Sequence, residues 1–167
     1  MLPATRRHVI AALPALAWAG LGPAQAAPDR ALLTVGGSIS RPNGESIANF
    51  DLARLEGLPQ HRIQTATPWH AGKPTFSGPL LRDILKAAGA QGQTLRMTAL
   101  NDYRVDLPTD DAERFDVIVA RLIDGRAMSV REKGPLFVMY PFDKHPELRN
   151  TVYFSRCIWQ LRRIEVR

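Results

Sequence analysis

The sequence has 167 residues, a formal net charge of +6 at pH 7 and a single cysteine, Cys157. One cysteine excludes an intramolecular disulfide, so packing of the core has to stabilise the domain. The basic residues are spread along the chain without a long run interleaved with aromatic residues. This distribution argues against nucleic acid as the partner and favours a small anionic or polar ligand.

The first 26 residues have the layout of a secretory leader. Two arginines at residues 6–7 precede an apolar stretch over residues 9–22, and residues 24–26 (AQA) form a cleavage site of the A-x-A type. The apolar stretch is too short for a membrane span. The arginine pair fits a twin-arginine signal and an ordinary export signal equally well. We therefore expect one mature domain, residues 27–167, in the periplasm or outside the cell.

Short runs of leucine, β-branched and aromatic residues between turn residues predict strands. They cover residues 32–39, 62–67, 95–100, 103–107, 117–123, 127–130 and 136–142. The nearly continuous apolar run over residues 117–123 is typical of a central strand. In the last segment, residues 153–166, the apolar positions change parity, which indicates a bulge or two separate elements.

Helices are fewer and shorter than strands in this prediction. Asp51 suits the N-cap of a short helix over residues 52–56. Ser77 suits the cap of a longer helix over residues 80–88, where apolar residues recur at helical spacing. A short helical turn is expected at residues 110–111. The fold class is therefore α+β, a mixed β-sheet with few short helices in a single domain.

One predicted hairpin carries side chains that could bind a ligand. The strands at residues 95–100 and 103–107 meet at Asn101 and Asp102, two residue types that tolerate positive φ in a tight turn. The turn displays Asp102 beside the phenol of Tyr103. A carboxylate next to an aromatic ring suits a flat heterocycle with several N–H donors. The alternative is a surface turn in which Asp102 only bonds its own backbone.

Other chemistry is sparse. His61, His70 and His145 do not stand at the spacing of metal ligands, and no acidic residue completes a metal set with them. Dinucleotide-binding, P-loop and nucleophile-elbow motifs are absent from the sequence. Cys157 stands in the apolar run CIWQL and is expected to be a small buried residue rather than a nucleophile.

The order of several motifs resembles the molybdopterin-binding domain of the sulfite oxidase family. The motifs are TPW, FSGPLLRDILKAAGA, ALNDYRVDLP, VIVARLIDG, GPLFVMYP and IWQLRRIEV, and with the strand that precedes them the resemblance runs from about residue 32 to residue 166. The resemblance implies the sulfite oxidase type of fold for nearly all of the mature chain.

In catalytic members of that family a cysteine thiolate binds molybdenum about four residues before a tryptophan. Counting back from Trp69 leads to Thr65, which cannot supply the soft sulfur ligand that this metal needs. Cys157 stands elsewhere in the chain. The sequence therefore looks most like the small exported members of this fold, which lack the ligand cysteine and act as pterin receptors.

This resemblance implies a non-catalytic periplasmic protein that binds a reduced pterin. It would report pterin levels to a membrane sensor with a periplasmic domain, of the diguanylate cyclase or phosphodiesterase type, that controls cyclic di-GMP. The alternative is a molybdopterin-dependent oxidoreductase with an atypical metal site. A third possibility is a small structural or assembly subunit that never binds pterin.

The resemblance also implies ligand-binding residues. Trp69 would stack on the pterin ring or form a wall beside it, or else belong to the core. Asp102 would accept hydrogen bonds from the 2-amino group and a ring N–H. Tyr103 would line the same site, or else only pack on its strand. Thr65 is included because it occupies the position of the family's metal ligand.

Three further residues complete the expected site. Arg131 and Lys133, just before Gly134, would bind a carbonyl or side-chain oxygen of the ligand, or else lie on a solvated face. Tyr140 would complete the rim of the pocket.

Overall fold

A computed structural model describes residues 30–167, so the predicted leader lies outside the described residues. Eleven strands in this part of the chain form three sheets. They are β1 (Leu33–Gly37), β2 (Ala48–Phe50), β3 (Gln60–Gln64), β4 (Thr75–Pro79), β5 (Thr94–Ala99), β6 (Arg104–Pro108), β7 (Ile118–Ala120), β8 (Leu122–Ile123), β9 (Arg126–Ala127), β10 (Phe137–Met139) and β11 (Leu161–Val166).

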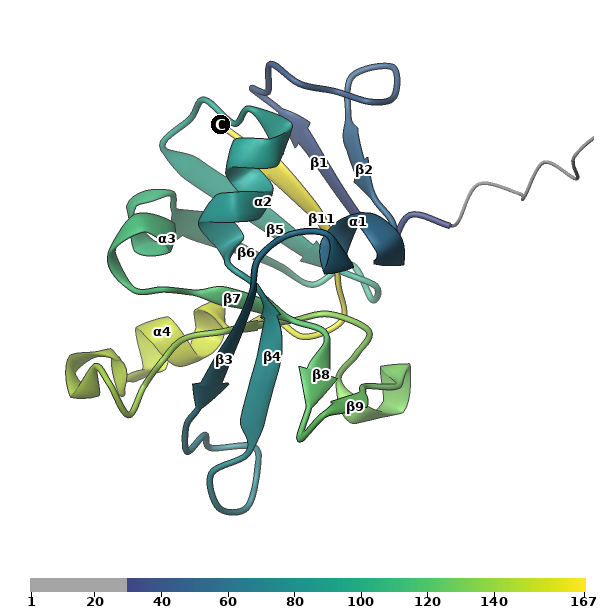
Figure 1. The fold of residues 1–167 in the computed structure, drawn as a ribbon. Helices are drawn as coiled ribbons and strands as arrows, with labels where there is room; N and C mark the ends of the chain where they lie inside the picture. The colour runs from purple at the N-terminus through teal and green to yellow at the C-terminus, as the bar shows by residue number, and fades with distance from the viewer. Residues whose placement is uncertain (1–29) are drawn as a thin grey trace, which may run out of the picture.

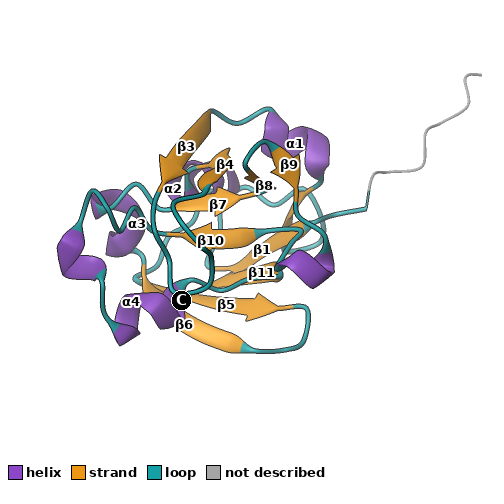
Figure 2. Cartoon of the chain, turned by 90° about the horizontal axis from the view of Figure 1, so that it is seen from below, coloured by secondary structure: helices purple, strands orange, loops and turns teal. Residues whose placement is uncertain are grey.

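The largest sheet has the strand order β2-β1-β11-β5-β6, and β1 and β11 are parallel while the other pairs are antiparallel. A second sheet has the order β3-β4-β8-β9, and β7 pairs with β10 in a third. Figure 2 shows β7 and β10 between the two larger sheets. The predicted α+β class with a mixed sheet is confirmed.

Four short α-helices accompany the sheets in the described residues: α1 (Leu52–Glu56), α2 (Leu81–Ala88), α3 (Asp110–Arg114) and α4 (Thr151–Arg156). The described residues also contain two 3-10 turns, η1 (Val130–Glu132) between β9 and β10 and η2 (Pro146–Leu148) between β10 and α4. Figure 1 shows α2 lying across the five-stranded sheet, with α3 beside it and α4 below. No helix of residues 30–167 combines the length and apolar character that a membrane span requires.

The helix predictions hold where the cap and the apolar stripe agree. Asp51 accepts a hydrogen bond from the Arg54 backbone N–H at 2.7 Å and so caps α1 as expected. In α2 the stripe of Leu81, Ile84, Leu85 and Ala88 is buried. Its last turn ends at a glycine with φ 66°, a conformation that glycine adopts without strain.

The predicted cap Ser77 is wrong, because Ser77 lies inside β4. There it pairs with Arg62 on one side and Leu122 on the other. The helix begins only after Pro79, with Leu80 at the N-cap position and no side-chain cap.

The predicted strand over residues 117–123 is divided at Arg121. Its first part, β7, pairs with β10, and its second part, β8, pairs with β4. Arg121 leaves the apolar run to form an ion pair with Glu56 at 2.9 Å.

The segment over residues 153–166 consists of two elements, and the change of parity predicted as a bulge or two elements falls at an irregularity within the second. The first is the end of α4, which Asn150 caps by accepting hydrogen bonds from the backbone N–H groups of Val152 and Tyr153. The second is β11, which carries a register irregularity between Leu161 and Arg163.

One hydrophobic core joins the three sheets and the helices. Among its fully buried members are Val35 of the five-stranded sheet, Phe76 of the four-stranded sheet and Phe137 of the two-stranded sheet. This core fixes the relative positions of the β3–β4 loop, the β5–β6 turn and the segment between α4 and β11.

Candidate functional site

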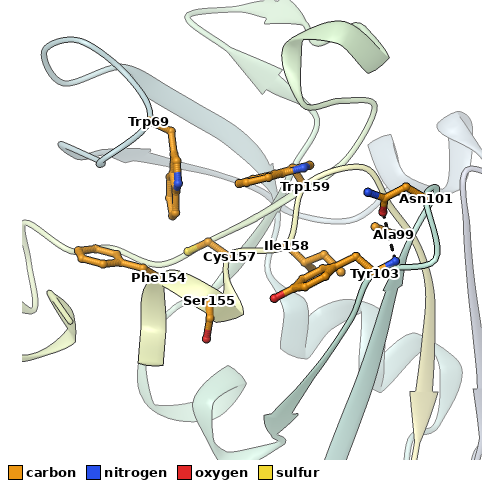
Figure 3. A pocket seen from close by; sticks show the side chains of 9 residues that line it. All are labelled: Trp69, Ala99, Asn101, Tyr103, Phe154, Ser155, Cys157, Ile158 and Trp159. Atoms are coloured by element: carbon orange, nitrogen blue, oxygen red, sulfur yellow. Dashed lines mark hydrogen bonds between the residues drawn. The ribbon is translucent and has the colours of Figure 1, made fainter. Parts of the chain in front are cut away.

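A cavity of about 420 Å³ opens where these three segments meet. Its lining combines aromatic, small and amide side chains, and Figure 3 shows them around the opening. The lining residues are Trp69, Ala99, Asn101, Tyr103, Phe154, Ser155, Cys157, Ile158 and Trp159. We call this cavity the aromatic pocket. Its volume falls within the range of about 300–1,000 Å³ that is usual for small-molecule sites.

Trp69 enters the pocket from the β3–β4 loop. Its backbone N–H donates to Thr67 Oγ1 at 3.4 Å, which holds the loop in a tight turn. The indole lies about 6 Å from the rings of Phe154 and Trp159, at nearly right angles to both. It also packs against Phe137 of the core at 5.9 Å. Trp69 is therefore both a partner of the core and a wall of the pocket.

His70 supports the same loop. Its Nδ1 lies 2.9 Å from Thr67 Oγ1, and its ring packs edge-on against Phe76. Burial, with a smaller effect from Lys133, lowers the pKa of His70 below its ordinary value. The imidazole is therefore mostly neutral at pH 7, and the hydrogen bond to Thr67 holds its ring in place.

The β5–β6 turn supplies the opposite wall. The strand pairing predicted for this hairpin is present, with Met97 opposite Val105. The Asn101 carboxamide accepts a hydrogen bond from the Tyr103 backbone N–H at 3.2 Å, drawn as a dashed line in Figure 3. The Tyr103 side chain is 51% exposed and lines the pocket.

Asp102 stands in the same turn but does not line the pocket. It has φ 64°, as the turn prediction required, and its backbone N–H donates to Ala99 O at 3.1 Å. Its exposed carboxylate forms an ion pair with Arg162 of β11. A contact between Asp102 and a ligand stays a prediction, and it requires the carboxylate to turn away from Arg162.

The third wall comes from α4 and the segment that follows it, which the sequence analysis did not assign to a site. Phe154, Ser155 and Trp159 line the pocket from this side. The available signal was the aromatic residue in the apolar run before β11, but its position beside Trp69 depends on tertiary packing. The Trp159 side chain is 37% exposed.

Cys157 lines the floor of the pocket, and Figure 3 shows its sulfur below the ring of Trp69. Only 2% of the residue is exposed, and burial raises the pKa of its thiol to about 12. The expectation of a small buried residue is confirmed. At neutral pH the group is a thiol and not a thiolate.

Two predicted basic residues follow the β8–β9 hairpin. Lys133 has φ 73°, and its Nζ lies 5.9 Å from the centre of the Trp159 ring, a cation–π distance. Arg131 lies on the exposed 3-10 turn η1 and does not line the pocket. Lys133 is therefore the nearer cation to the pocket mouth.

The structure puts Tyr140 in the core rather than at a pocket rim. Its side chain is fully buried, and its hydroxyl donates to Asp111 Oδ2 at 2.7 Å. Burial and the neighbouring carboxylate raise the pKa of this phenol above its ordinary value. Asp111 also accepts from Arg156 at 2.7 Å, so the buried pair anchors the end of α4 and with it one wall of the pocket.

Thr65 is also buried and belongs to a structural contact. Its hydroxyl donates to Asp143 Oδ1 at 3.2 Å and accepts from the Asp143 backbone N–H at 3.1 Å. Asp143 further pairs with Lys73 at 2.8 Å and with Arg149. The hydrogen bond from Lys73 is the main cause that lowers the pKa of Asp143 to about 2. These contacts fasten the start of the loop that carries Trp69.

The structure thus brings Trp69 and Tyr103 together at one pocket, with Lys133 near its mouth, and puts Thr65 and Tyr140 into supporting contacts. Within residues 30–167, no three histidine, cysteine or acidic side chains cluster as a metal site would require.

The fold and the pocket define a class: an α+β domain of mixed sheets with an aromatic pocket between its loops. No protein-family model matches the sequence, and a search of curated proteins finds no relative. Among solved structures, the chain is similar in fold to the sulfane dehydrogenase SoxCD from Paracoccus pantotrophus, with a TM-score of 0.58 and 16% sequence identity.

This likeness covers 80% of the chain and 37% of the SoxCD chain, so the protein spans little more than a third of that neighbour's length. At this identity the likeness concerns the fold alone. It supports, at the level of the fold, the resemblance to the sulfite oxidase family.

Proposed function

We propose that the protein is a pterin-binding module and that the aromatic pocket holds the pterin ring. The observation that carries the proposal is the meeting of Trp69, Tyr103, Phe154 and Trp159 around one cavity of about 420 Å³. Aromatic walls bind a flat heterocycle through stacking and edge contacts. The family resemblance and the fold of the domain favour a pterin over other heterocycles.

The side chains available as molybdenum ligands indicate that the proposed module is not catalytic. Molybdenum needs a soft sulfur ligand from the protein in the family that the sequence resembles. Thr65 has a hydroxyl that is already bonded to Asp143, and Cys157 is a buried neutral thiol. The residues present therefore do not fit the metal, although the aromatic pocket fits the organic ring of molybdopterin as well as a free reduced pterin.

The wider role that we propose is that of a periplasmic receptor. The leader-like residues 1–26 support export, and the resemblance supports a membrane sensor of the diguanylate cyclase or phosphodiesterase type as the partner. Large apolar side chains are exposed beside the pocket mouth, as expected at a protein contact. They are Leu100, Tyr103, Val130 and Trp159. A pterin-dependent change in cyclic di-GMP that is lost in Trp69→Ala would support this role.

The first experiment uses the full chain, produced in a bacterium and purified from its periplasm. The protein is denatured, and the supernatant is assayed for pterin fluorescence after oxidation and for molybdenum by elemental mass spectrometry. Pterin without metal supports the receptor. Stoichiometric molybdenum overturns the argument from Thr65 and Cys157 and calls for an oxidoreductase assay. Absence of pterin, with no binding on titration, leaves the structural subunit as the remaining hypothesis.

Titration with a pterin can be followed by intrinsic fluorescence because of the positions of the tryptophans. The sequence has three, and Trp18 belongs to the predicted leader. The other two, Trp69 and Trp159, both line the aromatic pocket. Once the leader is removed, quenching of intrinsic tryptophan fluorescence therefore reports on this pocket.

A further inference from the structure

We infer that Asn101 is a ligand-binding residue whose side-chain amide donates a hydrogen bond to a carbonyl oxygen on the edge of the bound ring. This interaction selects a 4-oxo pteridine over a 4-amino pteridine. The inference rests on the proposed function and names the residue that determines the specificity of the same pocket.

The orientation of the amide is fixed by its neighbour. The backbone N–H of Tyr103 can only donate, so the atom of Asn101 that lies 3.2 Å from it has to be the carboxamide oxygen. The amide nitrogen is then turned to the other side, and Figure 3 shows it facing Trp159. Within residues 30–167 this nitrogen has no hydrogen-bond partner, so its two hydrogens are free for a ligand.

A charged acceptor elsewhere in the pocket would favour a 4-amino ring. No carboxylate is among the lining residues, and the carboxylate of Asp102 is directed to Arg162. The hydroxyl of Ser155 donates its hydrogen to Val152 O at 2.7 Å, so towards a ligand its oxygen is only a neutral acceptor, weaker than a carboxylate. A 4-amino group presents N–H donors to the Asn101 amide donor, and two donors cannot pair. A carbonyl at the same ring position accepts from it.

The test compares two probes that share the 2-amino and 6-hydroxymethyl groups and differ at ring position 4: 6-hydroxymethylpterin and 2,4-diamino-6-hydroxymethylpteridine. Isothermal titration calorimetry gives the ratio of their Kd values. We expect the wild-type protein to bind the 4-oxo probe about tenfold more tightly, since a mismatched pair leaves a polar group unsatisfied.

The variant Asn101→Asp keeps the acceptor for the Tyr103 N–H, so the turn is retained, but it replaces the amide donor with a carboxylate. We expect its ratio of Kd values to reverse in favour of the diamino probe. Asn101→Ser is a second variant, because a serine hydroxyl can still accept from the N–H two residues on but is too short to reach the ring. It should lose the preference without gaining a charge.

The matched control is Leu100→Asp. This side chain is 44% exposed and does not line the pocket, so the variant adds the same charge one residue away. Its Kd ratio should equal that of the wild-type protein. Equal affinity of the wild-type protein for both probes, an unchanged ratio in Asn101→Asp, or the same change in Leu100→Asp would overturn the inference while the proposed function stands. Failure of the wild-type protein to bind either probe would overturn both.

Discussion

Trp69 offers the sharpest test of the aromatic pocket, because it serves the core and the proposed ligand at once. In Trp69→Ala the ring loses its contacts with Phe137, Phe154 and Trp159, all at about 6 Å. Aromatic pairs contribute about 0.5–1.5 kcal/mol each, so the loss of three pairs should lower the free energy of unfolding by about 1.5–4.5 kcal/mol. Domains of this size are usually stable by about 5–15 kcal/mol, and the variant should therefore still fold.

The effect on binding is separate from this loss. Stacking of a heterocyclic base on an aromatic side chain contributes about 1–3 kcal/mol, which corresponds to a rise in Kd of about 5- to 150-fold. Urea unfolding followed by circular dichroism measures the stability, and calorimetric titration with 6-hydroxymethylpterin measures the binding.

Phe50→Leu is the matched control, because Phe50 is fully buried in β2 and does not line the pocket. It should lower stability and leave pterin affinity unchanged. If Trp69→Ala unfolds as easily as expected but binds pterin with wild-type affinity, Trp69 is a core residue only and the pocket is not the pterin site.

Three further outcomes follow from the contacts around the pocket. Tyr140→Phe removes the hydroxyl that donates to the buried Asp111, and it should lower the free energy of unfolding, measured in urea, by about 1–3 kcal/mol. Tyr153→Phe is the control, because the Tyr153 hydroxyl has no partner within residues 30–167, and it should leave the free energy of unfolding nearly unchanged. The pKa of Asp143 is about 2 in the folded protein and 3.8 ordinarily, so its carboxylate stabilises the folded state above pH 4, and this stabilisation is lost as the pH falls towards 2. Asp143→Asn should flatten that part of the plot of unfolding free energy against pH. A plot identical to that of the wild-type protein would contradict the assignment. Cys157 has a thiol pKa of about 12 and should react slowly with N-ethylmaleimide at pH 8, and more slowly still with pterin bound. The unfolded protein should be labelled completely, and mass spectrometry measures the extent of labelling. Rapid labelling of the folded protein would mean that the floor of the pocket is open.

Local signals were sufficient for the elements that depend on neighbours in sequence. The β5–β6 hairpin follows from two turn residues that accept positive φ, and α1 follows from Asp51 and the apolar residues after it. The prediction of Ser77 as an N-cap was wrong, because a serine before a helix can be either a cap or a strand residue, and only its pairing partners decide which. Ser77 has such partners in Arg62 and Leu122, which stand far away along the chain.

The site was less accessible from the sequence for the same reason. Trp69 and Tyr103 were identified through the motifs that resemble a known family. Phe154 and Trp159 were not, since their positions depend on tertiary contacts. Phe154 lies on α4, which Arg156 ties to Asp111, and Trp159 pairs with Phe137 of β10. Tyr140 was expected at the rim, but its hydroxyl satisfies Asp111 in the interior instead.

The position of β11 affects how the protein has to be made. This strand lies between β1 and β5, so the middle of the largest sheet is filled by residues that a ribosome adds after all the other strands described here. Until then β1 and β2 form a two-stranded ribbon with an unpaired edge, which is marginally stable and prone to associate with other chains. The largest sheet therefore closes only once residues 161–166 have been made, and any truncation before residue 161 removes the strand that joins β1 to β5.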